Sequence, residues 1–358
     1  MTKYFDFVRK IVPEREISPQ VGLDIGRTSC KMIQLKPKGE GFEITDWGIE
    51  PIVGGQVGKA VSALLSKLSP PALSPNVALS GKGSLIRYID LPRMNAQDAK
   101  KSFNLEADKY FPFPINQIYL DCFILNPESK TEKMSVLAAA AKKELVDERM
   151  ELIRGLGLQL DFVTLDSVAL MNMLQQIDRG KIPTEKSAPD RELVEGPESI
   201  GIAILDIGAA VSNLMITIDL LPRFNRDIFI GGQEFTKSIA STMGVGLEEA
   251  EKLKQEPEEK QAEIMAACDS AVLNLVSELR LSFDYFVTEH NISIEKLLLV
   301  GGGAQVEGLP EILKGYLELP VMVWNPLEAL DVNEKISKEE LYQHAPLLGV
   351  ALGLAMYP

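Results

Sequence analysis

The sequence predicts an α/β protein built from two similar halves, and three observations lead to that prediction. Apolar, strand-like runs that end in Asp-Ile-Gly occur twice, at 21–26 and at 203–208, about half the chain apart. Small residues and a second strand-like run follow each of them, as expected for a β-hairpin with an acidic residue at its mouth. A third apolar run, at 297–300, leads into three consecutive glycines.

The composition narrows the class of protein. The 358 residues carry a formal net charge of −14, which argues against a nucleic-acid-binding protein. Three cysteines without metal-ligand spacing indicate free thiols in a reducing compartment. The segment 1–20 lacks a secretory signal, and polar residues interrupt the most apolar stretch, 199–221, so we expect a soluble cytoplasmic protein without a membrane span.

The first half is predicted to begin after an N-terminal extension, residues 1–20. Apolar residues near one helical face precede Pro13 there, which leaves two interpretations: a short helix docked on protein, or a helix at a membrane surface. The first half itself is predicted to comprise residues 21–84 and 156–180. Its first part has the order β-β-β-α-β, which favours a mixed sheet.

A small inserted subdomain is predicted at residues 85–155. A helix over 94–110 has Asn95 as its expected N-cap and a Phe-Pro-Phe-Pro stop after it. Strand-like runs at 118–125 and 134–141 follow, and a helix closed by glycine ends the block at about residue 155. The resulting α-β-β-α order of predicted elements differs from that of the segments on either side.

The second half is expected at 199–344, after a polar, proline-containing linker at 181–198. Within it, residues 235–293 are predicted to form a helical subdomain. The charged run 248–263 indicates a solvated pair of helices broken at Pro257. A C-terminal helix at 345–358 is expected to return to the first half.

The duplicated hairpins have the chemistry of a phosphate clamp. Glycine and small residues at a turn let backbone N–H groups approach a phosphate closely. An aspartate would repel phosphate directly, but it can hold Mg²⁺ through water, and the metal then neutralises the phosphates. No P-loop and no dinucleotide-binding glycine motif occurs, and only two histidines are present, which disfavours histidine-based catalysis.

These motifs resemble those of the actin, Hsp70 and sugar-kinase superfamily, and from about residue 20 to 358 the chain resembles the PilM family of type IV pilus assembly. The resemblance implies an actin-like ATPase fold with two ribonuclease-H-like halves and a small FtsA-like inserted subdomain. The chain ends without the basic amphipathic helix of FtsA, which favours PilM. The segments that carry the resemblance are 21–35, 105–121, 205–218, 222–240 and 297–313.

The resemblance further implies an adaptor that binds ATP and Mg²⁺. It would hold the N-terminal cytoplasmic segment of the inner-membrane protein PilN in a groove beside the inserted subdomain, and so sit peripherally at the inner membrane. It would thereby link the PilN–PilO complex to the pilus assembly motors. Two alternatives stay open, a small-molecule or sugar kinase of the same superfamily and an FtsA-like filament protein. Nucleotide binding is favoured over turnover, with at most weak ATPase activity.

The family pattern also nominates residues of this chain. Asp24 and Asp206 would face the metal through water, and Asp166 is the candidate for positioning water or, alternatively, a helix N-cap. Arg27 replaces a small hydroxyl residue, so it either adds a phosphate contact or crowds the γ-phosphate. The remaining candidates form the first phosphate loop (Gly26, Arg27, Thr28, Ser29, Lys31), the second phosphate loop (Gly208, Ala209, Ala210), a charged pair beside the adenosine (Glu251, Lys254) and the adenosine turn (Gly301, Gly302, Gly303, Gln305).

Overall fold

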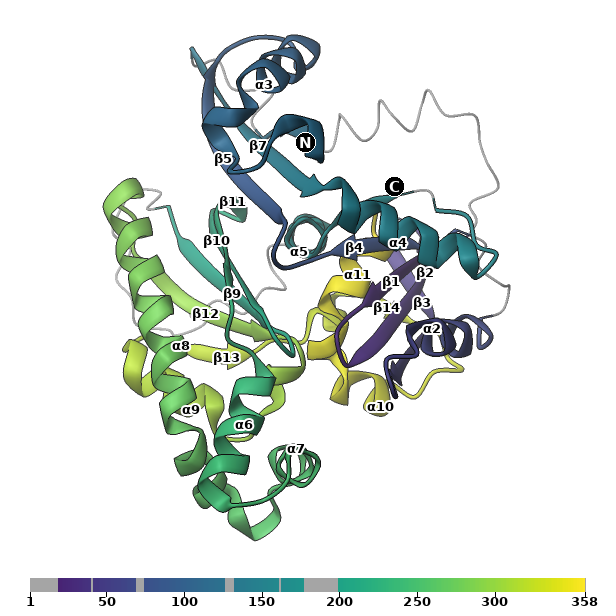
Figure 1. Ribbon diagram of the computed structural model, residues 1–358, viewed down its shortest axis with the longest axis vertical. Coiled ribbons are helices and arrows are strands. Elements are labelled where there is room, and N and C mark those ends of the chain that lie inside the picture. Colours follow the sequence, from purple (N-terminus) through teal and green to yellow (C-terminus); the bar gives the residue numbers. More distant parts are fainter. Residues whose placement is uncertain are drawn as a thin grey trace.

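Two sheet-containing halves and a smaller third unit make up the molecule in the computed structural model (Figure 1). The structure describes residues 19–39, 41–68, 74–125, 132–160, 162–176 and 199–357. The expected helix before Pro13 and the expected linker at 181–198 lie outside the described residues.

The first half contains a six-stranded sheet in the order β14-β3-β2-β1-β4-β8. β1, β2 and β3 form an antiparallel meander, and β4 and β8 then continue in parallel from β1. Helix α2 (Val57–Leu65) connects β3 to β4, and its apolar face packs on this sheet. The strands are β1 (Gln20–Ile25), β2 (Ser29–Lys38), β3 (Gly41–Pro51), β4 (Asn76–Leu79), β8 (Val163–Leu165) and β14 (Asp331–Val332).

The second half repeats this connectivity. Its sheet has the order β11-β10-β9-β12-β13, again with three antiparallel strands followed by two parallel ones. The predicted duplication is therefore a duplication of topology as well as of sequence. The strands are β9 (Gly201–Ile207), β10 (Ser212–Ile218), β11 (Leu221–Ile228), β12 (Ile294–Val300) and β13 (Val321–Val323), and the helices are α6 (Gly232–Met243), α7 (Leu247–Gln255), α8 (Gln261–His290) and α9 (Leu309–Leu317).

The smaller unit is a three-stranded sheet in the order β5-β7-β6, covered by helix α3 (Ala96–Tyr110). As predicted, the Asn95 side chain caps α3 by accepting a hydrogen bond from the backbone of Asp98, and the helix ends before Phe111. We call this unit, residues 84–142, the insert. Its strands are β5 (Ser84–Pro92), β6 (Ile118–Ile124) and β7 (Lys133–Lys142).

Helix α4 (Lys143–Gly155) follows β7 without a break but packs elsewhere. Its Ile153 is fully buried in the apolar cluster of the first-half sheet, together with Leu23 and Val61. The sequence analysis grouped this helix with the insert because the two are adjacent in the chain. Side-chain burial instead makes α4 a bridge between the insert and the first half.

The C-terminal segment returns to the first half through helix α11 (Gly349–Ala355), which packs on β1 and on α5 (Asp166–Gln176). The approach is so close that a Cβ on Gly353 would lie 1.9 Å from the carbonyl oxygen of Ala169. One apolar cluster around α5 and α11 also includes strand residues of both sheets, so the halves share a core. The other helices are α10 (Lys338–Gln343) and the 3-10 turns η1 (Ile115–Gln117), η4 (Glu258–Lys260), η5 (Gly302–Gln305), η6 (Pro326–Ala329) and η7 (Ala345–Leu348).

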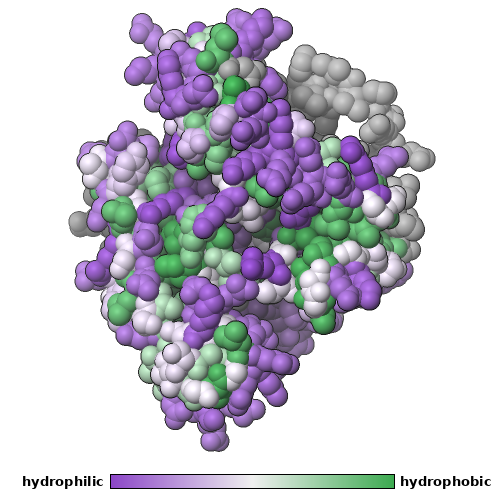
Figure 2. All heavy atoms as spheres, in the orientation of Figure 1, coloured by the Kyte–Doolittle hydropathy of each residue, from purple (hydrophilic) through white to green (hydrophobic). Residues whose placement is uncertain are grey.

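Polar residues cover the outer ends of the molecule, whereas apolar residues are visible near the centre of the face in Figure 2. Within the described ranges, no helix combines the length and the apolar character needed to cross a membrane.

Candidate functional site

The two hairpins have the same local geometry. In the first, the Gly26 N–H donates to the Ser29 carbonyl at 3.1 Å, and in the second, the Gly208 N–H donates to the Val211 carbonyl at 3.0 Å. Asp24 pairs in register with Lys31 across the first hairpin. Asp206 and Asn213 pair in register across the second hairpin. The repeat therefore places an aspartate and a polar partner side by side at the mouth of each turn.

The two aspartates lie close enough to interact across the boundary between the halves, and we call the space around them the cleft. Lys31 Nζ lies 3.0 Å from Asp24 Oδ2, and both side chains are largely buried. Burial alone would lower the pKa of Lys31, but Asp24 raises it, and Asp206 and Asp166 add to that effect. Lys31 thus interacts electrostatically with three carboxylates, which come from β1, β9 and the start of α5. The cleft is an acidic cluster around one lysine.

The charge of this cluster is incompletely balanced. Burial, together with repulsion from Asp24 and Asp206, raises the pKa of Asp166 to about 7, although a hydrogen bond from Ser80 and the charge of Arg149 act in the opposite direction. Burial and the Asp24 charge raise the pKa of Asp206 to about 6, although Lys31 and an Asn213 hydrogen bond act in the opposite direction. A carboxyl group with a pKa near 7 can both hold and release a proton at neutral pH.

The cluster fits a hydrated cation better than a directly ligated one. Within the described ranges, no group of three His, Cys, Asp or Glu side chains is close enough to hold a metal ion directly. Mg²⁺ commonly keeps several waters and uses one or two carboxylates together with substrate phosphates. Burial contributes most to the raised carboxyl pKa values, and the mutual repulsion of the carboxylates adds a negative potential that a dication would relieve. Asp24, Asp206 and Lys31 therefore fit a site for magnesium and a phosphate chain.

The triple-glycine turn lies directly beside this cluster, but its glycines have different roles. A Cβ on Gly301, which has a φ of +86°, would lie 2.2 Å from Asp206 Oδ1, and a Cβ on Gly303 would lie 2.2 Å from Ile207 Cγ2. Both glycines are thus needed for packing against β9. Only Gly302 of the three faces open space, so it alone offers a bare backbone surface.

The neighbouring backbone is tied to the C-terminal connection. The Gly301 N–H donates to the Pro346 carbonyl at 2.7 Å. Gln305, which was expected at the adenosine, donates its side-chain amide to the Gln343 carbonyl at 2.7 Å. These two bonds link the glycine turn to the segment that enters α11.

The second loop is held by the start of α6. The N–H groups of Gly232 and Gln233 donate to the carbonyls of Gly208 and Ala209 at 2.9 and 2.8 Å. Ala209 and Ala210 are half-buried at this loop, whereas Arg27 and Thr28 are exposed at the tip of the first loop and Ser29 is half-buried at the start of β2. The residues at the tip of the first loop are therefore more exposed than those of the second loop.

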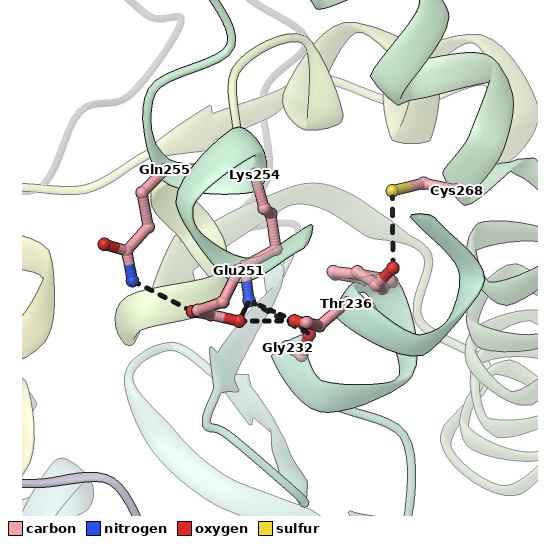
Figure 3. Close-up of polar contacts among 7 residues, drawn as sticks. Gly232, Thr236, Glu251, Lys254, Gln255 and Cys268 are labelled. Carbon is pink, nitrogen blue, oxygen red and sulfur yellow. Dashed lines mark hydrogen bonds and ion pairs between the residues drawn. The ribbon is translucent and has the colours of Figure 1, made fainter. Parts of the chain in front are cut away.

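Glu251 and Lys254 belong to a network that joins α7 to α6 (Figure 3). The buried Lys254 Nζ donates to the Gly232 carbonyl at 3.1 Å, to Thr236 Oγ1 at 2.8 Å and to Glu251 Oε2 at 2.6 Å. Burial would raise the pKa of Glu251, but hydrogen bonds from Lys254 and Thr236 lower it. All three ammonium protons have partners, so Lys254 positions the helices that flank the second loop.

Sequence analysis missed three residues of the cleft. Asn213 stands at the same offset from Asp206 as Lys31 from Asp24, so superposing the two hairpin sequences would have found it. Ser80, which follows β4, is hydrogen-bonded to Asp166. Arg149 of α4 reaches the Ile25 carbonyl at the end of β1. Only the tertiary structure brings Ser80 and Arg149 to the cleft.

A cavity of about 1440 Å³ extends from the acidic cluster towards the insert. Ser80, Asp166 and Asn213 line its inner end, and residues of β5, β11 and α8 line the remainder. The edge strands of two sheets, β5 and β11, therefore flank a space that opens onto the cleft.

Comparisons with known proteins agree with this architecture. A family model described as type IV pilus assembly protein PilM matches residues 22–357. A chain of a PilM–PilN type IV pilus biogenesis complex is similar over 97% of this chain and 100% of that chain, with 27% sequence identity and a TM-score of 0.80.

Two more distant structures share the fold alone. The ethanolamine utilization protein EutJ from Carboxydothermus hydrogenoformans has a TM-score of 0.53 and 16% identity, and covers 98% of this chain and 94% of its own. A diol dehydratase-reactivating factor in nucleotide-free form has a TM-score of 0.52 and 9% identity, and covers 94% of this chain and 98% of its own. With its two topologically equivalent halves, the chain has the actin-like ATPase fold.

Proposed function

The chain belongs to the PilM family of type IV pilus assembly proteins, and we propose that it is an ATP-binding adaptor for the cytoplasmic segment of PilN. Through PilN it would be held at the inner membrane and would join the PilN–PilO complex to the assembly motors. The observation that carries the nucleotide part of the proposal is the convergence of Asp24, Asp166 and Asp206 on Lys31 in one cleft.

The chemistry of the cleft favours binding. Bound Mg²⁺ would supply the positive charge that the three carboxylates lack, and it would allow anionic phosphates to approach them. Asp24 and Asp206 would orient the water shell of the metal, and Lys31 would act as a point charge towards the phosphates. Gly302 would leave the backbone open on the side of the nucleoside.

The edge strand β6 is our candidate for the PilN contact. Strand β6 is one of the two outer strands of the insert sheet, and it exposes Tyr119 and Phe123. These residues point to the same face because strand side chains alternate. A free strand edge with apolar side chains can accept an extended peptide as an additional strand.

The nucleotide part and the PilN part of the proposal can be tested in separate binding assays. We expect isothermal titration calorimetry to detect Mg²⁺–ATP binding to the full chain, and we expect Asp206→Asn to weaken it by about tenfold or more, since one charge-assisted contact is worth about 1.5–3 kcal/mol. Absence of any heat with ATP and with ADP, while the chain is folded, would remove the nucleotide part.

Fluorescence anisotropy with a labelled synthetic PilN cytoplasmic peptide tests the second part. We expect Phe123→Glu to weaken peptide binding by about tenfold or more, because a charge replaces an apolar contact. Leu105, which is 87% exposed on α3 of the same insert, provides the matched control, and Leu105→Glu should leave binding unchanged. Equal affinity of the two variants would exclude the β6 edge, and no binding by the unmodified chain would exclude the adaptor role.

A further inference from the structure

Helix α4 carries a half-buried cation, Arg149, to the base of the first phosphate loop. The Arg149 guanidinium donates to the Ile25 carbonyl through Nη1 and Nη2 at 3.4 and 3.5 Å, which are long hydrogen bonds. Ile25 is the last residue of β1 and directly precedes the first phosphate turn. Arg149 therefore lies at the base of the loop that begins with Gly26.

The guanidinium of Arg149 has few hydrogen-bond partners at this position. Burial lowers the pKa of Arg149, whereas the charges of Asp166 and Asp24 act in the opposite direction. Among the described residues, no carboxylate lies within ion-pair distance of it, and its five N–H donors share the single carbonyl of Ile25. A half-buried arginine with spare donors is a ready partner for an anion, and phosphate suits the geometry of its planar fork.

The same helix holds the insert with its opposite face. The Tyr119 hydroxyl of β6 donates to Asp147 Oδ1 at 3.2 Å, and Lys143 Nζ donates to the Asn116 carbonyl at 2.9 Å. Asp147 and Arg149 are two positions apart, so they point in nearly opposite directions around the helix. With Ile153 fixed in the first-half core, α4 connects the cleft to the β6 edge.

We propose that Arg149 binds the γ-phosphate of ATP. Through α4, it would couple the presence of that phosphate to the β6 edge of the insert. This inference rests on the proposed nucleotide site. It assigns the distinction between ATP and ADP to a residue outside both phosphate hairpins. It also explains why the chain continues directly from β7 into α4 without a flexible connection.

Calorimetric titration of the full chain with Mg²⁺–ATP and with Mg²⁺–ADP tests the first half of the inference. We expect Arg149→Gln to weaken ATP binding by about tenfold or more, the effect of one lost charge-assisted hydrogen bond, with ADP binding little changed. Arg149→Lys should be intermediate because it keeps the charge without the fork. Arg154, which is exposed in the last turn of the same helix, is the control, and Arg154→Gln should bind both nucleotides like the unmodified chain.

The outcomes separate the claims. One result would refute the phosphate role of Arg149 and leave the nucleotide site standing: the unmodified chain binds ATP, and Arg149→Gln either lowers the affinities for ATP and ADP equally or changes neither of them. If the unmodified chain binds neither nucleotide, the proposed function itself fails. Melting curves by circular dichroism identify a variant that has lost its fold, in which case Arg149→Lys decides.

Hydrogen exchange tests the coupling. We expect ATP to slow amide exchange in residues 118–124 of the unmodified chain and of Arg154→Gln, but not of Arg149→Lys or Arg149→Gln. An equal ATP response in all four proteins would refute the coupling through α4.

Discussion

Gly301 lies against the side chain of Asp206 so closely that a Cβ built on the glycine would be 2.2 Å from Asp206 Oδ1. The triple-glycine turn is thus in contact with the second hairpin. The absence of a side chain on Gly301, the residue that follows β12, leaves room for the carboxylate of Asp206.

We therefore expect Gly301→Ala to destabilise the protein by about 2–5 kcal/mol, the combined cost of left-handed backbone and overpacking. It should also weaken Mg²⁺–ATP binding because Asp206 must move. Gly302→Ala is the matched control for stability alone, since Gly302 faces open space. Urea denaturation would measure the loss of stability and calorimetry the loss of binding, and equal stability of the two variants would contradict this role for Gly301.

The raised carboxyl pKa values predict that these aspartates lower the stability of the folded chain at neutral pH, although they are needed for binding. The folded chain keeps protons on Asp206 and Asp166 up to a pH of about 6 and about 7, whereas the unfolded chain has released them near the ordinary value of 3.8. By linkage, these two groups make stability fall as pH rises through that window. Asp206→Asn removes one of the buried charges.

We expect Asp206→Asn to raise the free energy of unfolding at pH 8 by about 1–3 kcal/mol, with a smaller gain at pH 5, since one pKa unit corresponds to about 1.4 kcal/mol. The same variant should bind Mg²⁺–ATP more weakly. Asp284→Asn, at an exposed position of α8, provides a control whose stability change should not depend on pH. Urea titrations at both pH values measure this, and a gain at pH 8 no larger than at pH 5 would be the contrary result.

The network of Figure 3 predicts that Lys254 stabilises the second half. Lys254→Met should lower the free energy of unfolding by about 1–3 kcal/mol, because Gly232 and Thr236 lose a buried donor and Glu251 loses its counter-charge. Lys252 is exposed on the same helix, so Lys252→Met should change little. Thermal melts of the two variants provide the comparison, and equal melting temperatures would show that the network contributes no stability.

The close approach of α11 to α5 predicts a severe effect of one methyl group. Gly353→Ala would place its Cβ 1.9 Å from the Ala169 carbonyl oxygen. The Cβ is fixed to the α11 backbone and the oxygen belongs to the α5 backbone, so neither can rotate away, and we expect a loss of about 3 kcal/mol or more. Gly315→Ala serves as the opposite control, because Gly315 in α9 has open space and alanine should gain up to about 1 kcal/mol of helix stability. Chemical denaturation of both variants checks the contrast, which disappears if α11 can shift freely.

Local patterns identified most of the elements that build the cleft. The two Asp-Ile-Gly runs became the ends of β1 and β9, Asn95 became the cap of α3, and the triple glycine followed β12. The end of the insert was less predictable. The boundary after residue 155 was predicted from the α-β-β-α pattern of the sequence. The burial of Ile153 instead shows that α4 packs on the first half. Burial depends on which element lies opposite a helix, and the local sequence does not contain that information.

The duplication, the acidic hairpins and the family could be predicted from the sequence, because strand periodicity, glycine placement and motif order are written in adjacent residues. Which polar groups meet follows from the folding of distant segments onto one another: Arg149, Ser80 and Asp166 come from three separate segments, and Gln305 is tied to Gln343 by a hydrogen bond. The physical reason is that pKa values, ion pairs and close glycine contacts depend on distances through space, which the packing of α4, α5 and α11 sets.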